Sequence, residues 1–270
     1  MTMPAKITLY HSVESTCAQK VRLVLAAKQI AWSEKLLNLR KGEQFTAEYL
    51  RLNPKGVVPT LLHDGHVIRE STVINEYLDD AFPEPPLKPQ DTVLRAMMRL
   101  LVKTFDDEVH PAIGILTYAI AMRHQMNKLK SPAELEVHFA NIVDADRRQR
   151  QRATHQLGLK SPPAGVALAT LDRILADMES TLGRYPWLAG DDYSLADAAA
   201  VPYVVRMESL GLARLWGNRP NIARWLAQAV DTDNCRNTRD PWGGAVFLDT
   251  IQGYAEQARA DIDNLFGSMN

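Results

Sequence analysis

The chain has 270 residues, of which 46% are hydrophobic and 23% charged, a composition that excludes overall disorder and a fibrous repeat. Domains usually hold roughly 100 to 200 residues, so this length favours two of them. Lys plus Arg number 31 and Asp plus Glu number 32, which leaves a formal net charge of -1. No overall field therefore draws the chain to nucleic acid or to an anionic membrane, and a small-molecule partner is favoured.

The two cysteines, Cys17 and Cys235, form neither a disulfide framework nor a CxxC redox or metal site. This usage favours a reducing compartment, and we expect the cytoplasm. The first residues lack a charged segment followed by an apolar one, so we expect no export signal. The most apolar later stretch, residues 195–205, contains Asp197 and Pro202 and is too short to cross a bilayer, which predicts a core helix and no membrane partner.

Residues 1–82 predict a small α/β domain. Alternation at residues 6–10 predicts a strand, and the apolar residues at helical spacing after the following polar loop predict a helix. An apolar strand at residues 57–62, followed by Asp64-Gly65, predicts a tight hairpin. The other expected elements are a strand at residues 32–39, a short helix at 42–52, a strand at 67–68 and a helix at about 71–82. A βαβ unit is thus followed by an antiparallel pair.

The proline-rich string at residues 83–90 cannot sustain a helix or a central strand, and it predicts a linker. Beyond it, residues 91–270 predict an all-α domain, because nearly every periodic segment is helical. The segment at about residues 128–165 is polar and poorly periodic, and we interpret it as an insertion. The expected helices span about residues 91–127, 165–184, 194–210, 220–230 and 244–266.

A proline inside the apolar strand is the first feature that points to chemistry. Pro59 cannot donate to a sheet ladder, so it belongs at an edge or an irregularity. A cis bond there would leave the backbone of Val58 free to pair with an incoming peptide. The alternative is an ordinary proline at the start of a strand.

Two expected helix starts carry the other features. Glu70-Ser71 follows a strand, so Ser71 can offer its hydroxyl and amide to a carboxylate while Glu70 faces an ammonium, or Ser71 is an ordinary cap. Ser15-Thr16-Cys17 opens the first helix, where the helix dipole and free amides stabilise a thiolate, although caps have the same pattern.

Together, the order and spacing of these features resemble the glutathione transferases. The resemblance implies a thioredoxin-like α/β N-terminal domain, an all-α helical domain after it, and glutathione as co-substrate. It extends into the helical half, where Ser194 and Asp197 match the family's N-capping motif in a core helix. The residues that carry it are Leu9-Tyr10, Ser15-Thr16-Cys17, Val21 to Leu25, Asn53 to Leu61, Glu70 to Ile74 and Tyr193 to Asp197.

The resemblance also implies how each part of glutathione is held. Val58, before Pro59, would pair by its backbone with the cysteinyl part, and Glu70 and Ser71 would hold the γ-glutamyl end. Near the glycyl carboxylate it implies Lys41, together with Gln44 or Lys55, although the two lysines could equally be solvated.

Ser15 occupies the catalytic position of the serine-type classes. Its hydroxyl would donate to the glutathione sulfur and lower a thiol pKa of roughly 8.5 towards neutrality. Cys17 matches the last residue of the Ser-Ser-Cys motif of zeta-type maleylacetoacetate isomerases, but Thr16 replaces the middle serine. Cys17 is therefore either a buried, inert helix cysteine or an alternative catalytic residue for isomerase or thiol-transfer chemistry.

The implied activity is attack of the glutathione thiolate on a small, largely apolar electrophile. We expect that substrate between Ser15 and the first long helix, around Thr104, Asp107, His110 and Gly114. The 128–165 insertion and the run after Glu70 resemble the bacterial β-etherase branch, which implies cleavage of a β-aryl ether. The alternative from another class is a glutathione-binding module without turnover.

The family also pairs two chains, so we expect a homodimer in which Asp106 or Asp107 reaches the glutamyl group bound by the partner chain.

His63 and His66 flank the predicted hairpin tip without a second pair at metal-ligand spacing, so we expect surface histidines and no metal. The arginine-rich run at residues 147–152 follows two aspartates and lacks aromatic residues, which favours a solvated face over nucleic-acid binding.

Overall fold

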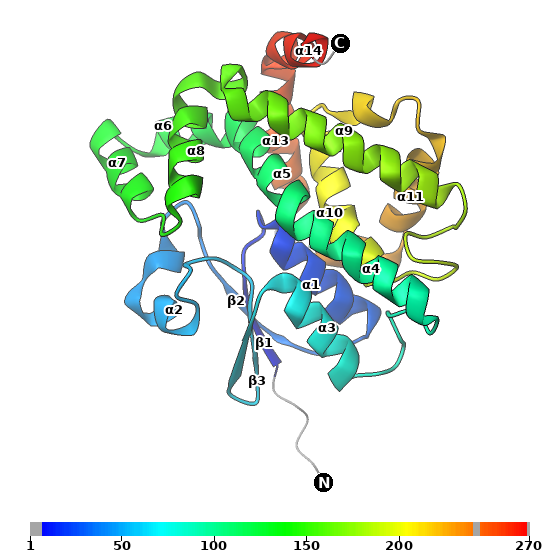
Figure 1. The fold of residues 1–270 in the computed structure, drawn as a ribbon. Coiled ribbons are helices and arrows are strands. Elements are labelled where there is room, and N and C mark those ends of the chain that lie inside the picture. The colour runs from blue at the N-terminus through cyan, green and yellow to red at the C-terminus, as the bar shows by residue number, and fades with distance from the viewer. Residues whose placement is uncertain (1–6, 240–243, 269–270) are drawn as a thin grey trace. The chain divides into compact units, whose positions relative to one another are not determined.

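The computed structural model describes residues 7–239 and 244–268 (Figure 1). Contacts between Cα atoms divide the chain into two compact units. The first unit contains Met1–Lys103, Tyr185–Pro202 and Ala227–Gly244, and the second contains Thr104–Arg184, Tyr203–Leu226 and Ala245–Asn270. The domain limits expected from the sequence, with a linker at residues 83–90, stay a prediction.

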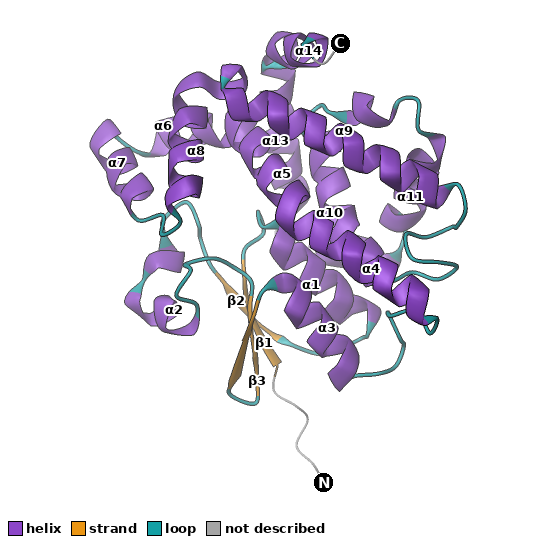
Figure 2. Cartoon of the chain, viewed as in Figure 1, coloured by secondary structure: helices purple, strands orange, loops and turns teal. Residues whose placement is uncertain are grey.

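A four-stranded mixed sheet forms the centre of the first unit (Figure 2). Its strand order is β2-β1-β3-β4, with β1 parallel to β2 and antiparallel to β3, and with β3 antiparallel to β4. The strands span Ile7–His11 (β1), Ser33–Leu36 (β2), Thr60–His63 (β3) and His66–Arg69 (β4). This arrangement confirms the expected βαβ unit followed by a hairpin.

Two helices, α1 (Thr16–Ala27) and α3 (Ser71–Ala81), contact each other and lie together beside this sheet (Figure 1). Apolar residues at helical and strand spacing face each other here, and the side chains with no exposed surface include Leu9, Val21, Leu61, Ile74 and Leu78. The short helix α2 (Ala47–Leu52), preceded by a 3-10 turn at Glu43–Phe45, is drawn on the other side of the sheet. The expected helix at 42–52 is thus two shorter pieces.

The residues after α3 are tied back to α1 by a buried cation. Lys28 Nζ donates to the carbonyl oxygens of Phe82 (2.6 Å) and Pro85 (2.8 Å), and the Asp79 carboxylate accepts from the Leu87 amide (2.9 Å). Polar side chains thereby satisfy backbone groups that a proline-rich segment cannot pair with itself. The helix α4 (Thr92–Thr104) follows.

Ser194 and Asp197 cap the helix α10 (Leu195–Ser209), which confirms the N-capping motif. Asp197 has no exposed surface and accepts from the Ser194 amide (2.9 Å), the Ser194 hydroxyl (2.8 Å) and the Leu188 amide (3.0 Å). The Ser194 hydroxyl in turn accepts from the Ala196 amide at 3.2 Å. A buried carboxylate with these three donors is stable because its oxygens are hydrogen-bonded.

The expected helix at 91–127 is continuous but contains two π-helical turns, at Phe105–Val109 and Tyr118–Met122. The segment interpreted as an insertion forms helices that its weak periodicity did not predict. These are α7 (Pro132–Ala140), which begins with a capping box between Ser131 and Glu134, and α8 (Ala145–Leu157), which Asp144 caps. Leu135 and Phe139 of α7 join a small core with Tyr118, Met126 and Ile142.

The remaining helices are α5 (His110–Thr117), α6 (Arg123–Leu129), α9 (Pro162–Leu182), α11 (Pro220–Val230), α12 (Asp233–Arg239), α13 (Gly244–Gln257) and α14 (Arg259–Gly267), with 3-10 turns at Gly158–Lys160 and Ala213–Trp216. The helix expected at 244–266 is interrupted at Ala258, and α12 was not expected. No helix within the described ranges is long and apolar enough to span a membrane.

Candidate functional site

The register of the strands places one terminus of each of the four strands at the same end of the sheet, which we call the sheet end. Parallel pairing places His11 beside Leu36, so β1 and β2 both finish there. Antiparallel pairing places Tyr10 opposite Thr60 and Thr60 opposite Arg69, so β3 begins and β4 finishes at the same end. The segments next to these four strand ends carry Ser15 after β1, Lys41 and Gln44 after β2, Val58 and Pro59 before β3, and Glu70 and Ser71 after β4.

A buried hydrogen-bond network holds the entry to β3. The Val57 carbonyl accepts from Tyr49 Oη (2.7 Å) and Asn53 Nδ2 (2.9 Å), and both side chains also reach Thr60 Oγ1, at 2.9 and 3.2 Å. Burial raises the pKa of Tyr49 to about 12, so this hydroxyl keeps its proton at neutral pH. Four fixed groups thus set the path of the chain around Val58.

Val58 and Pro59 are joined by a cis peptide bond, which confirms one of the two interpretations of Pro59. The β3 ladder begins at Thr60, so Val58 lies just outside the paired residues of the sheet. Both residues are buried. A backbone segment at this position can add an extended peptide by main-chain hydrogen bonds.

Glu70 and Ser71 form the start of α3. Glu70 has a positive φ of 67°, rare for a residue with a side chain, and its carboxylate lies 2.7 Å from Lys55 Nζ. No side chain caps this helix start, and Ser71 is buried. The first-turn amides and the Ser71 hydroxyl therefore provide donors where the helix dipole favours an anion.

Lys41 and Gln44 lie in the connection after β2. Lys41 is exposed, and its backbone amide donates to Asn38 Oδ1 at 3.1 Å. Gln44 is buried: its Nε2 donates to the Leu39 carbonyl at 3.3 Å, and its Oε1 has no hydrogen-bond partner in the described part of the chain. Lys55, the third residue expected here, is paired with Glu70 instead.

Ser15 is the N-cap of α1, and its Oγ accepts from the Ala18 amide at 3.1 Å. A hydroxyl that accepts in this way still has its own proton to donate. Cys17 follows in the first helical turn and is not part of a disulfide. Cys17 is half-buried, whereas the sequence favoured full burial; Val21 and Val24, which follow it on the same face of α1, are fully buried.

Two buried ionisable residues near Ser15, Arg22 and His11, were not predicted. The Arg22 guanidinium is buried and contacts His11 Nδ1 at 3.1 Å and the Ser12 carbonyl at 3.2 Å. Burial, and then the Arg22 charge, lower the pKa of His11 to about 3, so this imidazole is neutral. In the sequence, the signal was a charged residue within the apolar stretch from Val21 to Leu25.

Glu14 and Arg40 connect the two loops that hold Ser15 and Lys41. The Glu14 carboxylate lies 2.6 Å from Arg40 Nη2, with both side chains largely withdrawn from solvent. The pair therefore joins the residue before Ser15 to the residue before Lys41. Spacing along the chain gave no sign of it, because the sheet register brings the two loops together.

The four expected substrate-pocket residues lie on successive turns of one helical stretch in the second unit. Thr104 is half-buried, and Asp107, His110 and Gly114 are exposed. His110 Nδ1 lies 3.2 Å from the hydroxyl of Tyr203, which has no exposed surface. The structure thus presents these side chains on an accessible helix surface, and their role as a pocket stays a prediction.

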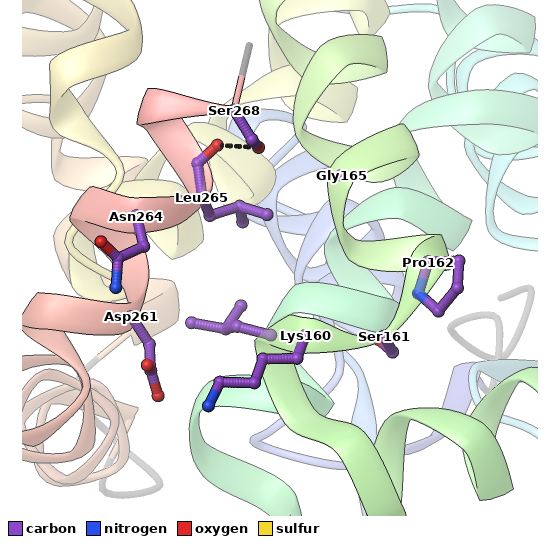
Figure 3. A pocket seen from close by; sticks show the side chains of 9 residues that line it. Lys160, Ser161, Pro162, Gly165, Asp261, Asn264, Leu265 and Ser268 are labelled. Carbon is purple, nitrogen blue, oxygen red and sulfur yellow. Dashed lines mark hydrogen bonds between the residues drawn. The ribbon is translucent and has the colours of Figure 1, made fainter.

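A pocket of about 320 Å³ lies between the start of α9 and α14 in the second unit (Figure 3). Lys160 and Asp261 point towards the same part of it (Figure 3). None of the residues implied by the resemblance lines this pocket.

Within the residues that the structure describes, no three His, Cys, Asp or Glu side chains gather as metal ligands. Of the hairpin histidines, His66 is exposed, but His63 packs between Tyr77 and Phe82.

The sheet end combines three chemical capacities. A strand edge at Val58 can bind a peptide backbone, the start of α3 can bind a carboxylate, and the Ser15 hydroxyl can donate to an anion. A small extended peptide with a carboxylate at one end and a thiolate in the middle fits this set of groups. Glu70 adds a carboxylate that can accept from an ammonium group.

Comparison with known proteins identifies relatives of this chain. A profile of the "Glutathione S-transferase, N-terminal domain" family matches residues 14–81, and one of the "Glutathione S-transferase, C-terminal domain" family matches residues 136–228. Protein LigF from Sphingobium sp. strain SYK-6 is 30% identical over 193 residues, which are 71% of this chain and 75% of that protein. Maleylacetoacetate isomerase from Mus musculus is 31% identical over 205 residues, 75% of this chain and 79% of that protein. The isomerase from Dictyostelium discoideum is 39% identical over 108 residues, which span 39% of this chain and 49% of that protein.

Solved structures agree with these sequence relatives. The crystal structure of beta-etherase LigF from Sphingobium sp. strain SYK-6 has a TM-score of 0.78 at 25% identity and covers 86% of this chain and 98% of its own. Glutathione transferase F7 from Populus trichocarpa has a TM-score of 0.68 at 20% identity, covering 87% and 99%, which shows a shared fold.

Proposed function

The chain belongs to the glutathione S-transferase family, whose members use glutathione as a co-substrate, and we propose that Ser15 activates the glutathione thiol for attack on a small electrophile. The observation that carries the proposal is the sheet end, where Val58, Ser71 and Ser15 leave neighbouring strands. Their donors and acceptors match the parts of this tripeptide. Calorimetry with glutathione tests it first, because a protein that binds no glutathione cannot perform the reaction.

The γ-glutamyl end of glutathione binds at the start of α3 in this proposal. Its carboxylate accepts from Ser71, and its ammonium group faces Glu70. The ion pair that now joins Glu70 to Lys55 is exposed, and such pairs are worth about 0 to 1 kcal/mol, so the ammonium can displace Lys55. The cysteinyl backbone pairs with Val58, and the glycyl carboxylate lies near Lys41 and the connection that contains Gln44.

The reaction begins with the glutathione thiolate, which Ser15 stabilises by a hydrogen bond. For a β-aryl ether, the sulfur forms a bond to the β carbon while the carbon–oxygen bond breaks. The aryl oxygen leaves with the electron pair as a phenolate and takes a proton to become a phenol. This substrate is supported by the name of the relative, beta-etherase LigF, which is similar over most of its length.

A model β-aryl ether tests this substrate. Release of a phenol that requires both the protein and glutathione supports the ether. If other electrophiles are conjugated and the ether is not, the transferase reaction stands and the ether proposal falls. If glutathione binds and no electrophile in a broad panel reacts, the alternative of a glutathione-binding module without turnover replaces the enzyme.

A second candidate is a glutathione-dependent isomerase or thiol transferase that uses Cys17. Similarity to maleylacetoacetate isomerases supports it, as does the half-buried position of Cys17 in the first turn of α1, two residues from Ser15. Isomerisation of maleylacetoacetate, or reduction of a mixed disulfide with glutathione, tests this candidate directly. Loss of that activity in Cys17→Ala, with conjugation retained, would assign the two reactions to different residues.

A homodimer is the proposed assembly. On α4, Val93, Met97 and Leu100 are 65%, 42% and 68% exposed at positions i, i+4 and i+7, which is one face of the helix. Beside it on α3, Val73 is 54% exposed, and Arg99 of α4 donates from Nε and Nη2 to the two carboxylate oxygens of Glu76 of α3. An exposed apolar stripe of this kind is typical of a surface that another chain covers. The partner's residues near the glutamyl group would be Asp106 or Asp107.

The proposed location is the cytoplasm. Neither Cys17 nor Cys235 forms a disulfide in the described part of the chain, and a reducing compartment preserves thiols in this state. Fractionation of cells that produce the protein tests this location.

A further inference from the structure

Arg22 is a buried cation in the second turn of α1, seven residues after Ser15. It stands between Val21 and Leu23 on α1, with 3% of its surface exposed. Its Nη1 contacts both His11 Nδ1 (3.1 Å) and the Ser12 carbonyl (3.2 Å), and its Nε donates to the Thr238 carbonyl of α12 (3.3 Å). Burying a guanidinium is costly unless its donors are satisfied, so these three contacts fix the side chain in one geometry.

The Arg22 guanidinium also holds His11 in one tautomer. Arginine only donates, so His11 Nδ1 must accept and the proton of the neutral ring is on Nε2. The imidazole has no exposed surface and packs edge-on against Trp32. Arg22 is therefore the charged member of the pair at neutral pH, since burial lowers its pKa only to about 10.

The Ser12 carbonyl connects Arg22 to Ser15. Besides Arg22 Nη1 it accepts from the Ser15 amide at 3.3 Å, which closes the turn between β1 and α1. Ser15 then caps α1 with its hydroxyl. One oxygen atom thus receives two donors, one from the buried cation and one from the backbone of the residue proposed to act on the thiol.

We propose that Arg22 is a positioning residue that holds the Ser12–Ser15 turn, and through it the direction in which the Ser15 hydroxyl donates to the glutathione sulfur. The inference rests on the proposed function. A displacement of about 1 Å is enough to weaken the hydrogen bond from a catalytic donor to its acceptor. Loss of the Arg22 contact to the Ser12 carbonyl should therefore change the thiol pKa measurably.

Other ionisable groups surround this turn and are kept in every variant below. Glu14 pairs with Arg40, Glu34 lies 3.9 Å from His11 Nε2, and Lys20 of α1 donates to Thr72 Oγ1 at 3.2 Å. Differences between variants therefore report on Arg22 and Ser15.

The experiment compares Arg22→Met, Arg22→Lys, Ser15→Ala and the double variant Arg22→Met/Ser15→Ala in the full chain. The first readout is the pKa of the bound glutathione thiol, from the ultraviolet absorbance of the thiolate. The second is the Kd of S-methylglutathione, which has no thiol proton and reports on the binding site alone. Lys28→Met is the matched control, because it removes another buried cation at the end of the same helix without contact to the Ser12 carbonyl.

We expect Arg22→Met to raise the thiol pKa by about one unit, a tenfold loss of thiolate, while the Kd of S-methylglutathione changes by less than about threefold. The double variant should equal Ser15→Ala, because both changes act through one hydroxyl. Arg22→Lys should resemble Arg22→Met, since lysine keeps the charge and lacks the planar fork. Lys28→Met should leave the thiol pKa unchanged.

Additive effects in the double variant, full recovery in Arg22→Lys, or an equal shift in Lys28→Met would each overturn the proposal. If Arg22→Met does not fold, Arg22→Lys decides alone: a raised thiol pKa supports positioning, and an unchanged one overturns it. If the wild-type protein binds neither glutathione nor S-methylglutathione, the proposed function itself fails. If it binds both and the Arg22 variants keep its thiol pKa, only this inference fails.

Discussion

The Lys28 ammonium group lies 2.7 Å from the Asp79 carboxylate, with side chains that are 0% and 4% exposed. Lys28 is the C-cap of α1 and Asp79 lies in the last turn of α3, so this ion pair joins the ends of two neighbouring helices. The same two side chains bind the backbone of the segment after α3. The pair therefore couples the packing of the helices to the path of the chain beyond them.

Asp79→Asn should lower the free energy of unfolding by about 3 to 5 kcal/mol, because it leaves the Lys28 charge buried without a counter-charge. Urea unfolding followed by circular dichroism measures the loss. The control is Arg152→Gln, which breaks an exposed ion pair with Glu136 and should cost no more than about 1 kcal/mol. Equal losses in the two variants would show that burial of the Lys28–Asp79 pair has no such role.

Ser71→Ala should weaken glutathione binding by about 1 to 3 kcal/mol, because it removes a hydroxyl from the glutamyl carboxylate. Titration calorimetry gives the change in Kd. Thr92→Ala is the matched control, since Thr92 is the first residue of α4 as Ser71 is of α3, and it should bind glutathione as the wild type does. A Ser71→Ala protein with unchanged affinity would move the glutamyl carboxylate to another place.

Ser15→Ala should lower the rate of conjugation at neutral pH by about 10- to 100-fold, the effect of losing a hydrogen bond to a charged group. Cys17→Ala should retain most of the rate. Steady-state kinetics with glutathione and one electrophile compare the two variants. The reverse result, an inactive Cys17→Ala and an active Ser15→Ala, would replace the thiolate mechanism by one that uses Cys17.

Leu100→Glu should turn the proposed dimer into a monomer, because it places a charge in the exposed apolar stripe of α4. Light scattering at micromolar concentration gives the mass. Leu129→Glu changes another exposed leucine, 59% accessible on α6, and should leave the mass unchanged. A wild-type protein that is already monomeric under these conditions would remove the dimer from the proposal.

The elements that the sequence predicted best are those specified by local patterns. Asp64 and Gly65 indicated the hairpin between β3 and β4, and both adopt the positive φ that such a turn requires. Ser194 and Asp197, three residues apart, indicated the capped start of α10. In each case, the signal and the structure that it specifies lie within a few residues.

Helices without a broad apolar face were harder to predict. In α8 only Thr154 is buried, so its sequence shows little periodicity, and it is held by its Asp144 cap and by packing from other elements. The segment of α12 is likewise short and polar, and it packs on α1. Contacts with residues distant in the sequence determine that such segments are helical, and the neighbouring residues in the sequence do not reveal those contacts.

At the candidate site, the sequence indicated the groups that would touch a ligand and missed those that hold them. Ser15, Val58 and Ser71 stand in recognisable local patterns. The contacts of Arg22 join residues 11, 12 and 238, which only the folded chain brings together. The only signal for Arg22 was a charged residue among the apolar residues from Val21 to Leu25, and neither its burial nor its acceptors could be identified from spacing.

The buried His11 predicts how stability changes with acid. Its pKa is about 3 in the folded chain, against 6.5 for an ordinary histidine, so between these values the unfolded chain binds a proton that the native chain does not. The stability associated with His11 is therefore complete above about pH 6.5 and is lost as the pH falls towards 3, by at most about 1.4 kcal/mol per pH unit.

His11→Asn should remove this dependence, because asparagine does not titrate while its Oδ1 can still accept from Arg22. Urea unfolding at several pH values between about 4 and 6.5 gives the free energy of unfolding. As the pH falls, this free energy should fall less steeply for His11→Asn than for the wild type, and the difference in slope should correspond to the uptake of about one proton on unfolding. Burial also lowers the pKa of His124, His138 and His155, but these residues are present in both proteins and cancel in the comparison. Parallel slopes for the two proteins would mean that His11 takes up its proton in the native state, and that the contact with Arg22 does not keep the ring neutral.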